Sequence, residues 1–438
     1  MYLFPKITER KLANGLTVLL VPDHEQQGLT VGLQIPVGEF SDPPSYEGTA
    51  ELTIGLMQKG TATLTPEEFA EKLEQTGTGL FAETGDEHLV LGCKMLSRHA
   101  EKVMPVFWEM LCSPRFDSRE LSRLKREMVT ALMAEGADPN ALANKHFFPV
   151  LCGKDHPAGR VHTIKSVKGI DLASIRLFYD AYFHPTGSVF VIAGDFDLQD
   201  FDDGWSSLCL KWKTREGKAP IVGKAILPLQ ESTVRIIDKK DITQAYLMMG
   251  HPVPGELAPD RSALALGNYI LGGGNFSSRL MERVRSKQGK TYGIGSQMIC
   301  NRQCGLFLIS TATQSAQMAE VVKTIFDVYR EFSTNGVTDE ELEKAKEFAV
   351  GNMAFQLEGI GNVAEKLLWL KLFGRENSYI EHFDEMISSL RKDAVNAAIR
   401  AYLSSEHFAM VVVARSKDVR SQISGFGKVT EMHFRAAP

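Results

Sequence analysis

Apolar residues occur along this chain in two patterns: short continuous runs, and longer stretches with helical spacing. Runs such as VFVIAG at 189–194 and AMVVVA at 409–414 are too short to cross a bilayer and predict buried strands. Stretches such as 164–182 and 387–403 have apolar residues three and four positions apart, which predicts amphipathic helices. The mixture is typical of an α+β protein.

The two halves of the chain end in the same way. The predicted helix at 164–182 precedes the run SVFVIAGDFD, and the predicted helix at 387–403 precedes FAMVVVARSKD. In the middle of the second half, Thr338 and Glu341 have the spacing of a capping box, in which each side chain bonds the other residue's N–H. We interpret the chain as an internal repeat.

Between the halves, residues 213–222 are polar and contain Gly217 and Pro220, which predicts a linker. We therefore expect two homologous α+β domains, an N-terminal one at 1–212 and a C-terminal one at 223–438. Each should contain a mixed or antiparallel β-sheet covered by helices, mainly on one side.

Composition narrows the class of protein. The 438 residues are 44% hydrophobic and 24% charged, and the net charge of −5 is spread over mixed acidic and basic positions. No basic stretch indicates nucleic acid, and no apolar run predicts a membrane span. The first residues do not resemble a secretory signal, so we expect a cytoplasmic protein, or a periplasmic one if an export signal has been trimmed. The six scattered cysteines favour free thiols.

Several short segments, in the right order over almost the whole chain, resemble one known family. NGLTVLLVPDH at 14–24, VGLQIPVGEF at 31–40 and the segment 48–61 resemble the insulinase/pitrilysin family of zinc metallopeptidases. HPAGR at 156–160 and both helix–strand endings fit as well. The chain most resembles the processing-peptidase branch of the family, whose members have two domains per chain. The resemblance implies the same two-domain fold for this chain.

Active members of this family carry the motif H-x-x-E-H in the segment that corresponds to 48–61. Its two histidines hold zinc from one helix face, and its glutamate takes a proton from the zinc-bound water. Here Glu51 stands at the first histidine, Ile54 at the glutamate and Gly55 at the second histidine. We therefore expect neither a catalytic metal nor any other cofactor in this chain.

The resemblance places the third zinc ligand, a glutamate, within 126–135. Ala131 or Leu132 stands at the expected position, and Glu127 and Glu135 flank it at the wrong helical phase. No two of the eleven histidines lie three to five residues apart, so no local pattern suggests a rebuilt site. His88, near this face, is interpreted as a strand surface residue.

The segment 270–292 resembles the signature of the family's second domain: a glycine-rich loop, a short helix, then an arginine and a tyrosine. Arg285 and Tyr292 occupy the last two places. The resemblance implies that they contact the substrate backbone and the developing oxyanion on a zinc-bearing domain that faces them. It also implies that four residues form a substrate-binding loop: Gly272, Gly273, Gly274 and Asn275.

The same segment has simpler interpretations from local sequence. Arg285 stands near a helix C-terminus, where the helix dipole favours any cation. Tyr292 could be an ordinary strand aromatic. The glycines could form a tight turn into a helix that is capped by Ser277 or Ser278.

Loss of the zinc motif together with retention of Arg285 and Tyr292 predicts a non-catalytic subunit of a heterodimeric zinc endopeptidase. Its partners would be a homologous zinc-bearing subunit, which supplies the zinc, and a peptide substrate. Two alternatives stay open: a structural or assembly protein, and a homodimer that encloses peptides without cutting them. An active enzyme with a rebuilt zinc site is the least favoured interpretation.

Overall fold

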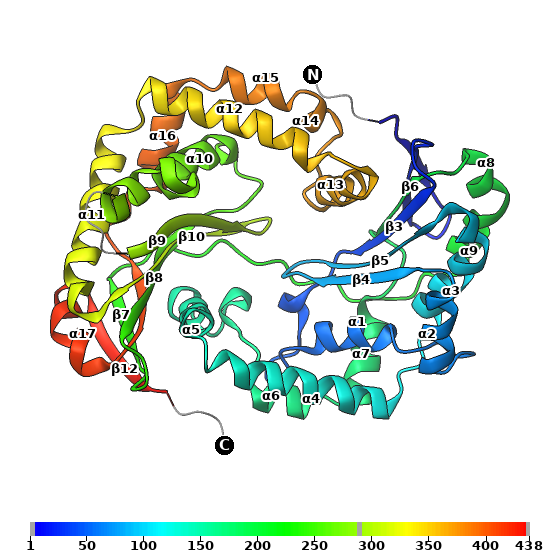
Figure 1. Ribbon diagram of the computed structural model, residues 1–438. Coiled ribbons are helices and arrows are strands. Elements are labelled where there is room, and N and C mark those ends of the chain that lie inside the picture. Colours follow the sequence, from blue (N-terminus) through cyan, green and yellow to red (C-terminus); the bar gives the residue numbers. More distant parts are fainter. Residues whose placement is uncertain (1–4, 287–290, 435–438) are drawn as a thin grey trace. The chain divides into compact units, whose positions relative to one another are not determined.

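The computed structural model describes residues 5–286 and 291–434, which form two compact units (Figure 1). Unit 1 comprises Met1–Thr130, His162–Val222 and Met353–Phe383, and unit 2 comprises Ala131–Val161, Gly223–Asn352 and Asp384–Pro438. The boundaries of these units differ from the single boundary expected at the linker 213–222. Each contains one helical segment from the other half of the sequence.

The elements of unit 1 are its six strands and the helices packed with them. They are β1 (Thr8–Lys11), β2 (Thr17–Pro22), β3 (Gly28–Ile35), α1 (Thr49–Met57), α2 (Pro66–Glu74), β4 (Gly79–Thr84), β5 (Leu89–Leu96), α3 (Ala100–Cys112), α4 (Ser118–Glu135), α6 (Ile164–Gly169), α7 (Leu172–Tyr182), β6 (Val189–Gly194), α8 (Leu198–Asp200), α9 (Ser206–Leu210), α13 (Ile360–Leu372) and α14 (Ser378–Glu381). The last residues of α4 belong to unit 2.

Unit 2 also contains six strands with their helices. Its elements are α5 (Pro139–Cys152), β7 (Thr233–Asp238), β8 (Gln244–Pro254), α10 (Arg261–Asn268), β9 (Thr291–Cys300), β10 (Cys304–Gln314), α11 (Met318–Asn335), α12 (Asp339–Gln356), α15 (Phe383–Ser389), α16 (Lys392–Tyr402), β11 (Ala409–Ala414), α17 (Ser416–Ile423) and β12 (Lys428–His433). The predicted capping box at the start of α12 is confirmed, because Glu341 N–H donates to Thr338 and Thr338 N–H donates to Glu341.

The two sheets are mixed and have matching strand orders. In unit 1 the order is β1-β2-β6-β3-β5-β4, and in unit 2 it is β12-β7-β11-β8-β10-β9. In each sheet the second and third strands are parallel, and the later pairs are antiparallel. The first strand differs: β1 is antiparallel to β2, whereas β12 is parallel to β7. The predicted α+β fold with helix-covered sheets is confirmed.

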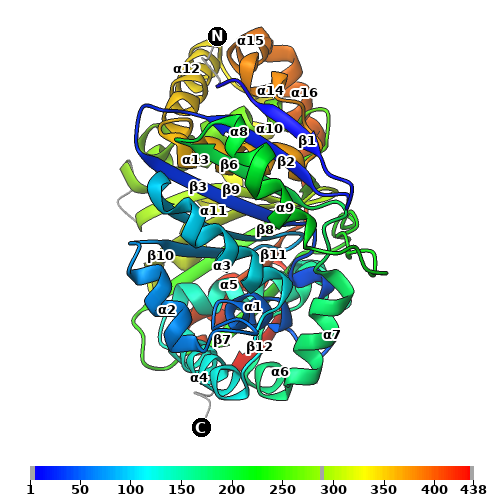
Figure 2. The same cartoon turned by 90° about the vertical axis from the view of Figure 1, so that its right-hand side faces the viewer.

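The sheet in unit 1 was expected to be covered mainly on one side, and α13, from the second half of the sequence, covers its other face. On strand β6, Val191 packs with Leu367 of α13 in one buried cluster. The next residue back, Phe190, points to the opposite face, where its ring lies 5.0 Å from that of Trp108 on α3. Figure 1 shows α13 and α3 on the two sides of the sheet, and Figure 2 shows α3 with α9 beside it.

Unit 2 repeats this arrangement with α5 and α11. Val411 of β11 packs with Phe147 of α5 in one buried cluster, and Phe307 of β10 contacts Tyr329 of α11 on the other face. The helix that completes each core comes from the other half of the sequence, which local patterns do not reveal. In the described residues, no helix is long and apolar enough to cross a membrane.

Candidate functional site

Helix α1 carries the three positions that correspond to the zinc motif. Glu51 is half-exposed, whereas Ile54 is buried in the core at 3% exposure. Gly55 has no side chain, and a Cβ built there would already meet a Leu124 methyl group at 3.7 Å. Two of the three positions therefore offer no donor atom, and the residues present do not fit a catalytic zinc ion.

Helix α4 does not replace the missing ligands. Ala131 and Leu132, at the place expected for the third ligand, have no donor side chains. The flanking carboxylates are both paired with cations: Glu127 with Arg123, and Glu135 with Lys145 at 2.7 Å. The first is an i,i+4 pair within α4, and the second joins the end of α4 to α5.

A cluster of titratable side chains nevertheless surrounds Glu51. The Nδ1 atom of His162 lies 3.5 Å from Oε2 of Glu51, and its Nε2 atom lies 3.5 Å from Oε2 of Glu39. The His162 side chain is 19% exposed. Sequence reasoning missed this cluster, because its members come from three separate segments and have no characteristic spacing.

The backbone around the cluster fixes these side chains. Glu39 begins a 3-10 turn (Glu39–Ser41) whose first N–H groups donate to carbonyls of the β4–β5 turn. His162 directly precedes Thr163, the N-cap of α6, which forms a capping box with Ser166. The hydroxyl of Ser166 also donates to the carbonyl of Glu47, just before α1. Outside the cluster, the start of α6 is thus joined to the residue before α1, and the 3-10 turn is anchored to the β4–β5 turn.

Asp42 connects the cluster to α1. Its carboxylate accepts the N–H of Gly48 at 2.7 Å and that of Ala50 at 2.8 Å, so it satisfies donors at the helix start. Burial raises the pKa of Asp42 to about 7, although both N–H groups act in the opposite direction. Burial disfavours charge on His162 as well, but Glu39, Glu51 and Asp42 outweigh it and raise the pKa of His162 to about 9.

His88 is not part of this cluster. It lies between β4 and β5, directly before β5, and its Nε2 atom is 3.6 Å from a carboxylate oxygen of Glu83. The other group of at least three candidate metal-binding side chains in the described residues is Asp238, Glu431 and His433 in unit 2. There, Asp238 already accepts the N–H of Ser416, and Glu431 is paired with Arg420.

In the second half, the predicted glycine loop is part of a helical turn. Gly272 and Gly273 end a π-helix (Tyr269–Gly273), and Gly274 is its C-cap. Ser277 ends a 3-10 turn (Asn275–Ser277), and Ser278 precedes two α-helical residues that lead into a π-helix (Met281–Ser286).

Arg285 lies in the second π-helix, and its guanidinium sits 4.8 Å from the ring centre of Phe276. Phe276 is 72% exposed, so the cation and the ring form a surface pair. Tyr292 is in β9, but its side chain and that of Asn275 lie outside the described residues. The substrate-binding role expected for Arg285 and Tyr292 is therefore still a prediction.

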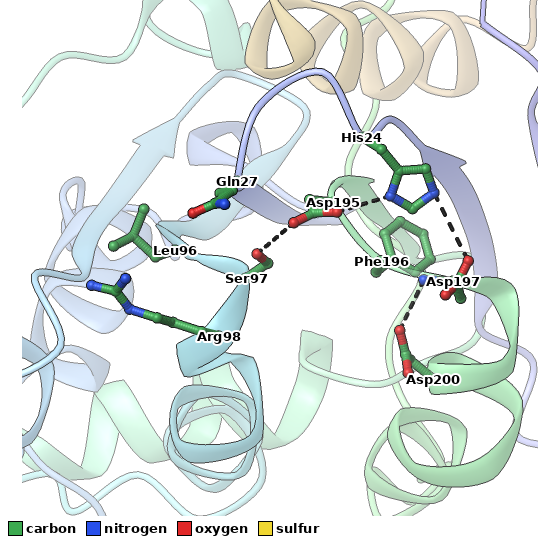
Figure 3. A pocket seen from close by; sticks show the side chains of 9 residues that line it. All are labelled: His24, Gln27, Leu96, Ser97, Arg98, Asp195, Phe196, Asp197 and Asp200. Atoms are coloured by element: carbon green, nitrogen blue, oxygen red, sulfur yellow. Dashed lines mark hydrogen bonds and ion pairs between the residues drawn. The ribbon is translucent and has the colours of Figure 1, made fainter.

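A polar pocket of about 440 Å³ lies where strands β5 and β6 of unit 1 end (Figure 3). Asp195 is at its centre, accepting from the Ser97 hydroxyl and from His24, both at 2.8 Å. The hydrogen bond to Asp195 raises the pKa of His24. Because the carboxylate holds both neighbours, neither Ser97 nor His24 is arranged as a nucleophile with its base.

Two family models match this chain. The model described as insulinase (peptidase family M16) matches residues 17–145, and the model described as peptidase M16 inactive domain matches residues 169–348. The first model covers α1 with Glu39 and Glu51, and it ends before His162. The second covers the segment with the glycines, Arg285 and Tyr292.

Curated relatives and solved structures agree with these matches. An "uncharacterized zinc protease" of Mycobacterium leprae is 25% identical over 417 residues, which is 92% of this chain and 90% of that protein. A "non-peptidase homolog" of Helicobacter pylori is 25% identical, with 87% of each chain covered.

A crystal structure described as a peptidase M16 inactive domain from Pseudomonas fluorescens superposes with a TM-score of 0.86. It is 25% identical to this chain, and the match covers 93% of this chain and 98% of that one. The fold, the family models and the missing ligands on α1 lead to one conclusion. The chain belongs to the insulinase family of peptidases, family M16, as a non-catalytic member.

Proposed function

We propose that this chain is the non-catalytic subunit of a heterodimeric zinc endopeptidase. The observation that carries the proposal is the contrast between the two halves. On α1, Ile54 is buried in the core and Gly55 has no side chain, so the metal-binding face is lost. The second half keeps the glycine-rich segment, Arg285 and Tyr292 in the family order. A partner subunit would supply the zinc.

In this proposal Arg285 and Tyr292 bind the substrate backbone and the developing oxyanion. A guanidinium is always charged and offers several N–H donors, which suits a carbonyl oxygen that gains negative charge. The exposed ring of Phe276 beneath Arg285 supports this role, since it holds the cation at the surface without neutralising it. Gly272, Gly273, Gly274 and Asn275 would border the peptide.

The test is reconstitution with a zinc-bearing homologue and a peptide-cleavage assay. Arg285→Ala and Tyr292→Phe should each lower kcat/KM of the mixture at least tenfold. Arg283→Ala is the matched control: it removes an arginine two residues away that is paired with Glu331 at 3.0 Å. Equal activity of the Arg285, Tyr292 and control variants would rule out the proposed role and favour a structural or assembly subunit.

Two further properties belong to the same proposal. The isolated chain should contain no stoichiometric zinc, which metal analysis measures, and it should not cleave peptides alone. Light scattering with labelled peptide distinguishes the homodimeric peptide-binding alternative, which requires a stable homodimer that captures peptide without a partner. We propose a cytoplasmic location, with the periplasm as the alternative, and cell fractionation distinguishes the two.

A further inference from the structure

Loss of the zinc motif does not explain the cluster formed by Glu39, Glu51 and His162. Their donor atoms all lie within 4.8 Å of one another, a spacing at which side chains can share a cation. The three residues come from the 3-10 turn, from α1 and from the residue before the α6 N-cap. A cation shared here would hold these three segments of unit 1 together.

The orientation of the imidazole decides which cation fits. Nδ1 faces the Glu51 carboxylate and Nε2 faces the Glu39 carboxylate, both at 3.5 Å. A neutral imidazole carries one N–H, so one carboxylate would face a lone pair. The Nε2 atom is buried and makes no hydrogen bond, so it faces the Glu39 carboxylate at ion-pair distance only. An imidazolium offers one N–H to each carboxylate and removes this repulsion.

A metal ion fits this arrangement less well. A single ion binds only one nitrogen of a ring, and the two carboxylates face different nitrogens. The nitrogen that did not bind the ion would still face a carboxylate, and a metal ligand must be unprotonated. Asp42 is a third carboxyl group that favours the charged form of the ring.

We propose that His162 is the resident cation of this site, an imidazolium that bridges Glu39 and Glu51 and excludes a divalent metal at neutral pH. The proposal is independent of any partner subunit. It implies that the start of α1, the 3-10 turn and the α6 N-cap are held together without a metal. The bridge opens only when the ring loses its proton, at alkaline pH.

The experiment is an NMR pH titration of the full chain with labelled histidine rings, with His162 assigned by the signal missing in His162→Gln. We expect a midpoint near pH 9, in line with the raised pKa of His162. Glu39→Gln and Glu51→Gln should each lower the midpoint towards 6.5, because each removes one carboxylate. Glu47→Gln, at a half-buried neighbour whose carboxylate accepts the Ser45 N–H, is the control and should leave it unchanged.

Zinc chloride titrated calorimetrically at pH 7 provides the second measurement. We expect no stoichiometric binding to the wild-type chain. A His162 midpoint near 6.5, or one bound zinc that Glu51→Gln abolishes, would overturn the proposal. If His162→Gln does not fold, the signal that moves in both glutamine variants but not in Glu47→Gln identifies His162.

Discussion

The Nδ1 atom of His162 lies 3.5 Å from Oε2 of Glu51. Glu51 stands where active relatives place their first zinc-binding histidine, and in this chain its neighbour is an imidazole from a distant segment. This chain therefore has a carboxylate–imidazole contact at the first motif position. Its other two motif positions, Ile54 and Gly55, have no donor atom in their side chains.

Each unit has a core helix from the other half of the sequence. A mutation in that helix should therefore destabilise the unit in which the helix packs. Leu367 lies in the second half of the sequence but is fully buried with Val191 in unit 1. Leu367→Ala should lower the free energy of unfolding by about 2–5 kcal/mol, through lost burial and a residual cavity. Urea unfolding followed by circular dichroism measures this loss.

Leu177→Ala is the control for Leu367→Ala, since Leu177 is 71% exposed and its truncation should cost little. A fragment that ends at residue 222 lacks α13 and should expose one face of the unit 1 sheet. If that fragment unfolded cooperatively, with the stability of unit 1, α13 would not be part of its core.

Asp42 should be important for the stability of α1. Its buried carboxylate accepts the N–H groups of Gly48 and Ala50, so Asp42→Ala leaves two donors without an acceptor. We expect a loss of about 2–3 kcal/mol in urea unfolding. Asp138→Ala, which removes the exposed N-cap of α5, is the comparison and should cost about 1 kcal/mol. Equal losses would contradict the importance of burial at Asp42.

Gly272 and Gly273 should differ in how well they tolerate substitution by alanine. A Cβ at Gly272 would lie 2.5 Å from Oγ and 2.6 Å from the backbone nitrogen of Ser296, so Gly272→Ala must displace β9. We expect a loss of about 1–3 kcal/mol. At Gly273 the nearest atom is the side-chain nitrogen of Asn268 at 3.0 Å, which can move. Gly273→Ala should cost less than about 1 kcal/mol, and thermal melting of both variants compares them.

His251 should make the stability of unit 2 sensitive to acid. It is buried against Tyr329, whose hydroxyl lies 2.7 Å from its Nε2 atom, and burial lowers its pKa to about 4. Below pH 6.5 the unfolded chain binds a proton that the folded chain does not. The free energy of unfolding should therefore fall by up to about 3 kcal/mol between pH 6.5 and 4.

Urea unfolding at several pH values tests this contribution of His251. His251→Asn is less stable at pH 7, because the Tyr329 hydroxyl loses its ring partner, but its stability should depend less on pH over this range. His382→Asn, at an exposed position, should keep the wild-type slope. An unchanged slope in His251→Asn would show that other groups cause the acid sensitivity.

The sequence by itself determined the buried strands, the capping box and the family, because these depend on local information. The apolar runs at 189–194 and 409–414 are buried strands, and Thr338 with Glu341 forms the expected capping box. The absence of donors at Ile54 and Gly55 is likewise a property of single residues. Backbone hydrogen bonding and the spacing of apolar side chains suffice for such conclusions.

Only the tertiary structure decided which segments meet. Helix α13 lies in the second half of the sequence, yet its apolar residues complete the core of unit 1. His162 joins Glu39 and Glu51 although no spacing connects them. Burial and charge pairing act between residues that are close in space, and chain folding sets those distances. The sequence therefore showed that the zinc motif is absent, and the structure showed that a histidine lies beside its first position.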